Sequence, residues 1–256
     1  MDNKNFVITE ENVESYSIKM GNWIKEHIKS SGANGVVLGM SSGVDCSTVA
    51  ALCSKNNINV HLILMPYGDN MEKTKNYSDA MELINKFGFD YHIFDIKPAV
   101  DSLEIKNLEN KNDELINLAK ANIRPRIRMT YLYEYAQINN LLVIGTGNLS
   151  ERTVGYFTKW GDGASDLNPM GMLTKKEVYI LANYLGVPES IINKKPSADL
   201  WEGQTDEQEL GITYSQIDEY ILKGTTGDTN VDEIIKLKHE RTNHKLKPIP
   251  IFNLNK

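Results

Sequence analysis

Residues 35–54 read G-V-V-L-G-M-S-S-G-V-D-C-S-T-V-A-A-L-C-S, and this stretch decides the fold. Its first part, residues 36–40, is a short apolar run that predicts a buried parallel strand. Residues 41–43 form a turn of small residues, and residues 44–54 are predicted to form a helix. A strand that turns directly into a helix leaves backbone N–H groups free above the turn, where the helix dipole also favours a phosphate. This stretch alone leaves open whether the turn binds a phosphate or is a tight turn without a ligand.

The alternation of strand and helix continues to about residue 145. Strands are predicted at residues 36–40, 62–65, 91–95 and 142–145, and helices at residues 47–55, 72–87 and 113–140. An amino-terminal helix precedes them, with apolar residues at helical spacing at Val13, Tyr16, Met20, Trp23, Ile24 and Ile28. This order predicts an α/β fold with a doubly wound parallel sheet covered by helices on both faces. Ligands of such sheets bind at the carboxyl ends of the strands.

The carboxyl-terminal part of the chain is predicted to be helical. Helical patterns occupy residues 174–185, 214–222 and 231–243, and no strand pattern follows residue 145. Long loops at residues 145–173 and 193–211 are rich in Gly, Asp and Thr, which suits binding better than packing.

Size and charge limit the classes of function. A chain of 256 residues suits one sizeable domain, and we expect residues 1–256 to form a single domain. The net charge of −6 at pH 7 argues against a general nucleic-acid binder, since such proteins are usually basic. It does not exclude a polyanionic ligand, because such a ligand responds to a local cluster of charge.

The cysteines and the apolar runs indicate a cytoplasmic protein without a membrane partner. Cys46 and Cys53 are the only cysteines, and they lie seven residues apart on one predicted helix. About 10 Å of helical rise separates them, so they cannot form a disulfide, and they match no zinc pattern. Residues 1–11 are polar and no apolar run is long enough to cross a bilayer, so we expect no signal peptide and no membrane span.

With Asp45 and Cys46 after it, the turn resembles the pyrophosphatase loop S-G-G-x-D-S of synthetases that cleave ATP to AMP. It lacks the Walker pattern G-x-x-x-x-G-K-[ST] and the dinucleotide pattern G-x-G-x-x-G. The resemblance implies that the loop binds the β,γ-pyrophosphate and that Asp45 holds Mg²⁺ against the phosphate oxygens. Ser42 stands where this loop has glycine. If the position needs φ > 0, its side chain costs about 1–2 kcal/mol; otherwise its hydroxyl adds a phosphate donor.

Four further segments extend the resemblance to a family. They are G-T-G-N-L-S-E at residues 145–151, G-Y-F-T-K-W-G-D-G-A-S-D at 155–166, L-T-K-K at 173–176, and P-S-A-D-L at 196–200 continued by T-D-E-Q-E-L-G at 205–211. In this order they resemble the NAD⁺ synthetases, over roughly residues 13 to 250. The resemblance implies an adenine-nucleotide α-hydrolase-like fold and ATP-dependent amidation of nicotinic acid adenine dinucleotide (deamido-NAD⁺). An adenylated intermediate would react with ammonia to give NAD⁺, AMP and pyrophosphate. No glutaminase domain fits before Gly35, so the ammonia-dependent short form is expected.

The resemblance also implies a role for individual residues. It assigns ATP binding to Gly39, Met40, Ser41, Ser42, Gly43, Val44, Asp45, Cys46, Thr146, Lys175 and Ser197. It assigns Mg²⁺ to Asp45 and Glu151, and deamido-NAD⁺ to Arg126, Lys159, Asp166, His244 and Lys245. Two carboxylates with phosphate oxygens and waters suit Mg²⁺. Lys159 and Lys175 are the expected catalytic residues, because their charge would offset the charge that grows on the phosphates.

Local structure and assembly complete the expectations. Pro125 interrupts the helical pattern and is expected to bias Arg124 towards an extended conformation. The alternating Tyr131, Tyr133 and Tyr135 are interpreted as packing or dimer contacts. Family members form homodimers, so a homodimer is expected here, with residues 16–28 and 129–135 as candidate interface segments.

Other interpretations remain open for single residues and for the whole chain. By itself, Asp45 is a first-turn acid that stabilises its helix, and Glu151 is a surface acid. Another adenylating synthetase would carry the same loop and act on a purine nucleotide, an amino acid or tRNA. A nucleotide-binding sensor would need the loop, but not the four residues Lys159, Asp162, Asp166 and Lys175 together.

Overall fold

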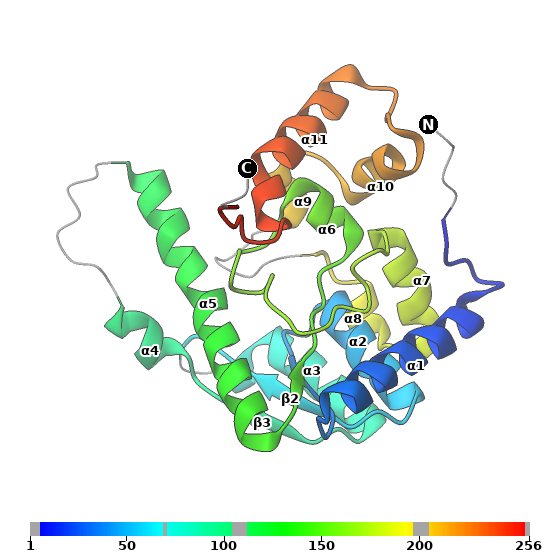
Figure 1. Ribbon diagram of the computed structural model, residues 1–256, viewed down its shortest axis with the longest axis vertical. Helices are drawn as coiled ribbons and strands as arrows, with labels where there is room; N and C mark the ends of the chain where they lie inside the picture. Colours follow the sequence, from blue (N-terminus) through cyan, green and yellow to red (C-terminus); the bar gives the residue numbers. More distant parts are fainter. Residues whose placement is uncertain (1–5, 69–70, 104–111, 197–204, 254–256) are drawn as a thin grey trace.

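A parallel sheet lies among helices in the lower half of the molecule in the computed structural model, which describes residues 6–68, 71–103, 112–196 and 205–253 (Figure 1). Its strands are β1 (Val36–Gly39), β2 (Val60–Leu64), β3 (Tyr91–Ile93) and β4 (Leu142–Val143). They lie in the order β3-β2-β1-β4, and every pair is parallel. Val36 of β1 pairs with Val60 on one side and with Leu142 on the other. The sheet therefore extends from β1 in both directions, as a doubly wound fold requires.

Alternate residues of each strand face two separate apolar cores. Val36 and Leu38 pack into the larger core, while Val37 faces the other side of the sheet. The larger core is covered by α1 (Val13–Ser31), α2 (Val44–Lys55), α3 (Lys75–Phe87), α7 (Lys175–Leu185) and α8 (Glu189–Ile192). The opposite face is covered by α4 (Lys97–Ser102) and the long helix α5 (Asp113–Asn139). Helices therefore cover both faces of the sheet, and β1 and most of β2 are buried, whereas the edge strand β3 is largely exposed.

The carboxyl-terminal helices form a smaller third core above the sheet (Figure 1). It contains α6 (Leu149–Val154), α9 (Asp206–Leu210), α10 (Tyr214–Lys223) and α11 (Thr229–Thr242), which the 3₁₀ turn η2 (Asn243–Lys245) follows. Val154, Ile217 and Ile235 pack together there. None of the helices in the described part of the chain combines the length and apolar composition that a bilayer crossing needs.

The predicted elements are confirmed with shifted ends. Each predicted strand is present within two residues at either end, and Ile144, expected in the fourth strand, forms only an isolated bridge to Leu167. The helix predicted at residues 72–87 is divided into the 3₁₀ turn η1 (Met71–Lys73) and α3. The sequence did not predict the short helices α4, α6, α8 and α9.

One local expectation was wrong. Pro125 lies inside the continuous helix α5, so Arg124 is helical rather than extended. A proline in a helix interior costs about 3 kcal/mol because it removes a hydrogen bond and crowds the preceding turn. Ile123 and Ile127, on either side of it, pack against the sheet, and this burial holds the helix across the proline.

Candidate active site

The turn between β1 and α2 provides backbone donors at the edge of the sheet. Gly43 is the N-cap residue of α2 and has no side chain to occupy the amides of the first turn. Ser42, just before it, is fully buried and has φ = 60°, in the left-handed region. The position thus requires the conformation that glycine adopts freely, and serine there costs about 1–2 kcal/mol. The hydroxyl of Ser41 lies 3.3 Å from Cys46 Sγ, whose thiol also donates to the Gly43 carbonyl.

The order of the strands brings a second loop beside this turn. β1 and β4 are neighbours, so the segment after β4 begins next to the segment after β1. Asn148, in that second segment, donates from Nδ2 to Asp45 Oδ1 at 2.8 Å. This is the switch point of a doubly wound sheet, where ligands of this fold bind.

Lys175 joins the two loops to a third element. Its Nζ lies 2.6 Å from Asp45 Oδ2 and 3.2 Å from Glu151 Oε1, and 4.7 Å from the centre of the Tyr214 ring. The Lys175 side chain is 3% exposed, and the two acidic side chains are 17% exposed. Residues from α2, α6 and α7 therefore meet in one nearly dry cluster, in which the lysine is the cation between two carboxylates.

The charges in this cluster shift one another's pKa values. Burial and the neighbouring Asp45 raise the pKa of Glu151 to about 7, against the opposing effect of Lys175. Burial tends to lower the pKa of Lys175, but Asp45 and Glu151 more than offset it, so this pKa is raised. Lys175 is consequently a permanent ammonium, and a second cation at the acids would relieve their mutual repulsion.

Capping interactions fix where α6 and α7, the helices that carry Glu151 and Lys175, begin. Asn148 and Glu151 form a capping box at the start of α6, so Glu151 also accepts from the backbone of Asn148. Thr174 and Glu177 form a second capping box at the start of α7, directly before Lys175. These local sequence signals place Glu151 and Lys175 in the first turns of their helices.

Asp218 of α10 ties the same two helices together and was missed in the sequence. Its carboxylate is buried and accepts from the Ser150 hydroxyl, from Lys176 N at 2.9 Å and from Lys175 N at 3.4 Å. Tyr214, on the same helix, donates to Asp206 at 2.9 Å. Neither Asp218 nor Tyr214 belongs to a local motif, and Asp218 lies 42 residues from Lys176 and 68 residues from Ser150, so the sequence carries no signal for the contacts of Asp218.

Four of the five residues expected to bind deamido-NAD⁺ lie together. Arg126 Nε donates to the Lys159 carbonyl at 3.3 Å, and Lys159 Nζ donates to the His244 carbonyl at 3.0 Å. Lys245 Nζ donates at 2.7 Å to the carbonyls of both Gly155 and Phe157. The carboxyl-terminal turn η2 is thereby attached to the loop that carries Lys159.

Asp166 lies apart from that group, against the sheet. Its carboxylate accepts from Val143 N at 2.7 Å and from the Tyr133 hydroxyl at 3.3 Å. Burial is the main cause that raises the pKa of Tyr133 to about 12, and the negative charge of Asp166 is the second cause. In this structure, Asp166 therefore fixes the loop to β4 and α5. Ser197, another expected contact, lies outside the described residues.

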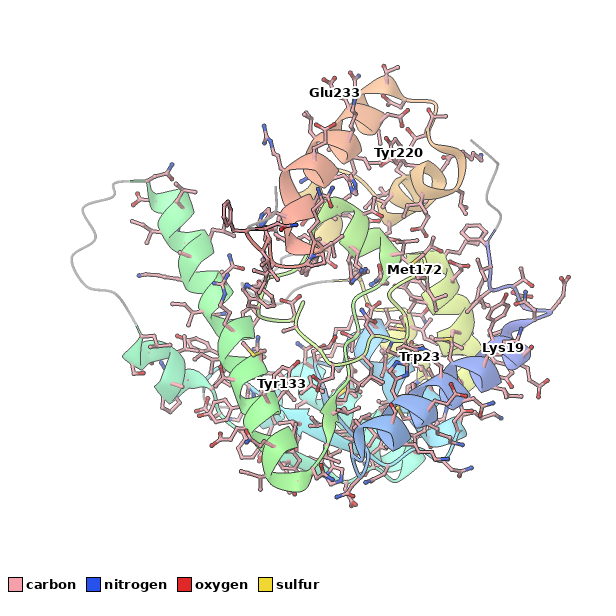
Figure 2. The ribbon with its side chains drawn as sticks, in the orientation of Figure 1. Lys19, Trp23, Tyr133, Met172, Tyr220 and Glu233 are labelled. Carbon is pink, nitrogen blue, oxygen red and sulfur yellow. The ribbon has the colours of Figure 1, made fainter. Side chains whose placement is uncertain are left out.

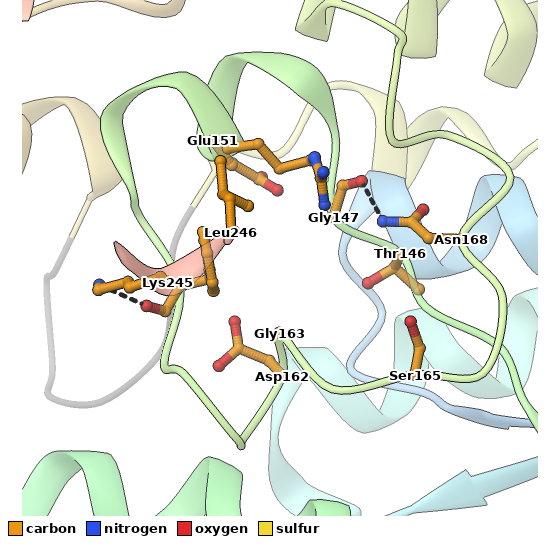
Figure 3. A pocket seen from close by; sticks show the side chains of 11 residues that line it. Thr146, Gly147, Glu151, Asp162, Gly163, Ser165, Asn168, Lys245 and Leu246 are labelled. Carbon is orange, nitrogen blue, oxygen red and sulfur yellow. Dashed lines mark hydrogen bonds between the residues drawn. The ribbon is translucent and has the colours of Figure 1, made fainter. Parts of the chain in front are cut away.

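A cavity of about 190 Å³ is lined by Glu151 of the acidic cluster and by Lys245 of the residues predicted to bind deamido-NAD⁺ (Figure 3). Around it, Glu151 lies at the top of the view, Thr146 at the right, Lys245 at the left and Asp162 at the bottom. Burial raises the pKa of Asp162, and burial lowers the pKa of Lys245. The cavity thus lies between one member of the acidic cluster, Glu151, and one basic residue that was predicted to bind the dinucleotide, Lys245.

The donor set suits a magnesium ion better than a zinc ion. No group of three or more His, Cys, Asp and Glu residues in the described ranges is arranged to hold a metal by itself. Asp45 and Glu151 nevertheless converge on one point, the Lys175 ammonium. Two carboxylates completed by phosphate oxygens and water fit Mg²⁺, whereas zinc needs three or four protein ligands.

Comparison with known proteins gives consistent matches over nearly the whole chain. The family model described as NAD synthase matches residues 16–249. The NH(3)-dependent NAD(+) synthetase of Carboxydothermus hydrogenoformans is 44% identical over 241 residues, which are 93% of this chain and 97% of that protein. The protein of the same name from Archaeoglobus fulgidus is 41% identical over 246 residues, 94% of this chain and 97% of that protein.

Two solved structures are similar in fold and in sequence. The NMN synthetase of Francisella tularensis has a TM-score of 0.86 at 37% identity, covering 94% of this chain and 99% of that one. The NH3-dependent NAD synthetase of Campylobacter jejuni, in complex with the nitrate ion, has a TM-score of 0.76 at 34% identity, with the same coverage.

Proposed function

The chain belongs to the NAD synthase family, and we propose that the cluster of Asp45, Glu151 and Lys175 is the centre at which it performs the family's reaction. The reaction is the ATP-dependent amidation of deamido-NAD⁺ with ammonia, the last step of NAD⁺ biosynthesis. One observation carries the assignment of the centre. The Lys175 ammonium lies 2.6 Å from Asp45, in the first turn of α2, and 3.2 Å from Glu151 of α6, at the switch point of the sheet.

The turn of residues 39–46 is proposed to bind the ATP phosphates. Backbone amides at the start of α2 and the positive end of its dipole favour a phosphate group. Thr146 and Lys175 are proposed as further ATP contacts, and Ser197 remains a prediction. Lys175 would offset charge on the phosphates as the nicotinate carboxylate attacks the α-phosphorus and pyrophosphate leaves.

Mg²⁺ is the proposed cofactor, with ATP as the co-substrate. Asp45 and Glu151 would hold the ion, and when bound it would neutralise the charge of the phosphate oxygens. Support comes from the two convergent carboxylates and from the raised pKa of Glu151, whose causes are burial and the charge of Asp45.

The basic residues across the cavity are proposed to bind deamido-NAD⁺. Arg126 and Lys245 would offer charge to its pyrophosphate, and Lys159 and His244 would fix the loop and turn around it. The role of Asp166 in substrate binding remains a prediction. Placing the nicotinate carboxylate beside the ATP α-phosphorus supplies much of the rate without a covalent nucleophile.

A second substrate has support from one observation. The Francisella tularensis NMN synthetase has a higher TM-score than the Campylobacter jejuni NAD synthetase, 0.86 against 0.76. Amidation that gives NMN directly would start from nicotinic acid mononucleotide, which lacks the adenylate half of deamido-NAD⁺. The two substrates share the reacting carboxylate, so the same acidic cluster would serve either of them.

One assay tests the function and compares the two substrates. The protein is incubated with ATP, MgCl₂, ammonium chloride and either deamido-NAD⁺ or nicotinic acid mononucleotide, and the amidated product and AMP are measured. We expect equal amounts of NAD⁺ and AMP from deamido-NAD⁺, and a kcat/KM at least about tenfold lower for the mononucleotide, equal to about 1.4 kcal/mol of lost binding. Release of ADP instead of AMP would contradict the mechanism. A higher kcat/KM for the mononucleotide would contradict the assignment of deamido-NAD⁺ as the substrate.

The assembly of the chain is also a proposal. The chain acts on small molecules, and we propose that it does so as a homodimer. Trp23 on α1 and Tyr133 on α5 mark the two predicted interface segments (Figure 2). Light scattering would test this, since a monomer at assay concentration would contradict the homodimer.

A cytoplasmic location is proposed from the thiols. Cys46 and Cys53 are both free, which fits a reducing compartment. The organisation of residues 1–256 as one domain without a glutaminase domain stays a prediction.

A further inference from the structure

Lys194 contacts the turn of residues 39–46, the proposed phosphate loop, from outside the cluster of Asp45, Glu151 and Lys175. It follows α8, and its Nζ donates to Ser42 Oγ at 3.1 Å, to Asn76 Oδ1 at 2.5 Å and to Asp79 Oδ2 at 3.4 Å. An ammonium group has three donors, and these three acceptors engage all of them. Asp79 is buried and Lys194 is 19% exposed, so the contact lies mostly out of water.

The acceptor in the loop is the residue with the least favourable backbone. Ser42 is the fully buried residue with φ = 60°, and its hydroxyl is what Lys194 binds. Asn76 and Asp79 belong to α3, which packs in the main core, so they hold the ammonium against a rigid helix. The loop conformation is thereby anchored to α3 through a single side chain.

We propose that Lys194 is a positioning residue for ATP: its ammonium holds Ser42 in the left-handed conformation that aims the loop amides at the phosphates. A glycine at this position reaches φ > 0 at no steric cost and needs no such anchor. A serine needs one, because its side chain disfavours the conformation but provides a hydroxyl that the anchor can bind. The inference rests on the proposed role of the loop in ATP binding.

The test compares Lys194→Met in two backgrounds, the natural Ser42 and the variant Ser42→Gly. In the natural background we expect Lys194→Met to raise the KM for ATP about tenfold, from loss of a charge-assisted hydrogen bond, while the KM for deamido-NAD⁺ changes less than about twofold. In the Ser42→Gly background, the same substitution should raise the KM for ATP less than about threefold, because glycine keeps the loop conformation unaided. The exposed neighbour gives the control, since Lys195→Met should leave both constants unchanged.

Two outcomes would overturn the inference. Equal factors in the two backgrounds would mean that Lys194 does not act through the conformation of Ser42. Parallel increases in the KM of both substrates, with a lowered Tm, would mean that it supports the fold in general.

A second pair of variants decides the matter if Lys194→Met does not fold, since it leaves Asp79 without its cation. Ser42→Ala removes the hydroxyl and keeps the Cβ, whereas Ser42→Gly removes both. We expect the Ser42→Ala variant to have the higher KM for ATP, by about threefold or more, and an equal or lower value would contradict the proposal. Calorimetric titration of the wild-type protein with α,β-methylene-ATP separates a failure of the proposed ATP-binding role of the loop from a failure of the role of Lys194. No binding would remove the proposed role of the loop, whereas normal binding with a failed comparison would remove only the role of Lys194.

Discussion

Two lysines reach the phosphate loop, and their surroundings differ. Lys175 lies between the carboxylates of Asp45 and Glu151 and is almost fully buried. Lys194 donates to a hydroxyl, an amide oxygen and one carboxylate, and it is partly exposed. The first lysine forms part of a charge cluster that the polyphosphate and the cation would rearrange in the proposed reaction. The second is proposed to stabilise the left-handed backbone conformation of Ser42.

The largest effect is expected at the first lysine. Lys175→Met should lower kcat about 10²- to 10³-fold, because a cation aimed at the developing charge is lost. It should also destabilise the fold by about 3–5 kcal/mol, since two carboxylates are left without their partner. Lys176→Met, at the exposed next position, is the matched control. Steady-state kinetics and urea unfolding measure both effects, and an unchanged kcat would remove Lys175 from the centre.

The proposed Mg²⁺ ligand Glu151 gives the next largest effect. Glu151→Gln keeps the size of the side chain and removes its charge, so the Mg²⁺ concentration for half-maximal rate should rise at least about tenfold. Glu209→Gln, in the exposed first turn of α9, is the control. It removes one carboxylate outside the cluster and keeps Asp45 and Glu151. The same Mg²⁺ dependence in wild type and Glu151→Gln would show that Glu151 is no ligand. Addition of EDTA should abolish turnover in both.

The link through Asp218 is expected to have an intermediate effect. Asp218→Ala leaves the Ser150 hydroxyl and the Lys176 amide without their buried acceptor, so the free energy of unfolding should fall by about 1–3 kcal/mol. Because Glu151 and Lys175 lie beside these donors, kcat should fall as well. Glu219→Ala, on the exposed side of α10, should change neither quantity by more than about 0.5 kcal/mol. A fall in stability with unchanged kcat would limit Asp218 to the fold.

The smallest expected effect concerns the strained loop residue itself. Ser42→Ala keeps the left-handed penalty and loses the bond to Lys194, whereas Ser42→Gly loses both the penalty and the bond. The glycine variant should therefore be more stable than the alanine variant by about 1 kcal/mol. Thermal unfolding of the two variants measures the difference, and a more stable alanine variant would contradict the left-handed conformation.

The sequence predicted the sheet and the loops of the site because these depend on local patterns. Apolar runs marked the strands, and small residues after residues 36–40 marked the turn. The sequence left open whether Ser42 needs φ > 0, and the structure gives it φ = 60°. The short helices α6 and α9 escaped notice because they rest on caps and tertiary packing rather than on a periodic apolar face.

Contacts between distant segments could not be predicted from the sequence. Lys194 lies 152 residues from Ser42, and Asp218 lies 68 residues from Ser150. In both cases the polar groups meet only because the helices pack around the sheet. The expectation that Pro125 interrupts the helix was wrong for the same reason, because the burial of Ile123 and Ile127 outweighs the local tendency of proline to break a helix.

A crystal structure with α,β-methylene-ATP and Mn²⁺ in place of Mg²⁺ tests the central claim most directly, because anomalous scattering locates the manganese ion. We expect the polyphosphate over residues 40–45, with the ion between the carboxylates of Asp45 and Glu151 and the Lys175 ammonium moved onto the phosphates. A nucleotide bound elsewhere, or an ion that touches neither carboxylate while Lys175 keeps its present contacts, would contradict the account.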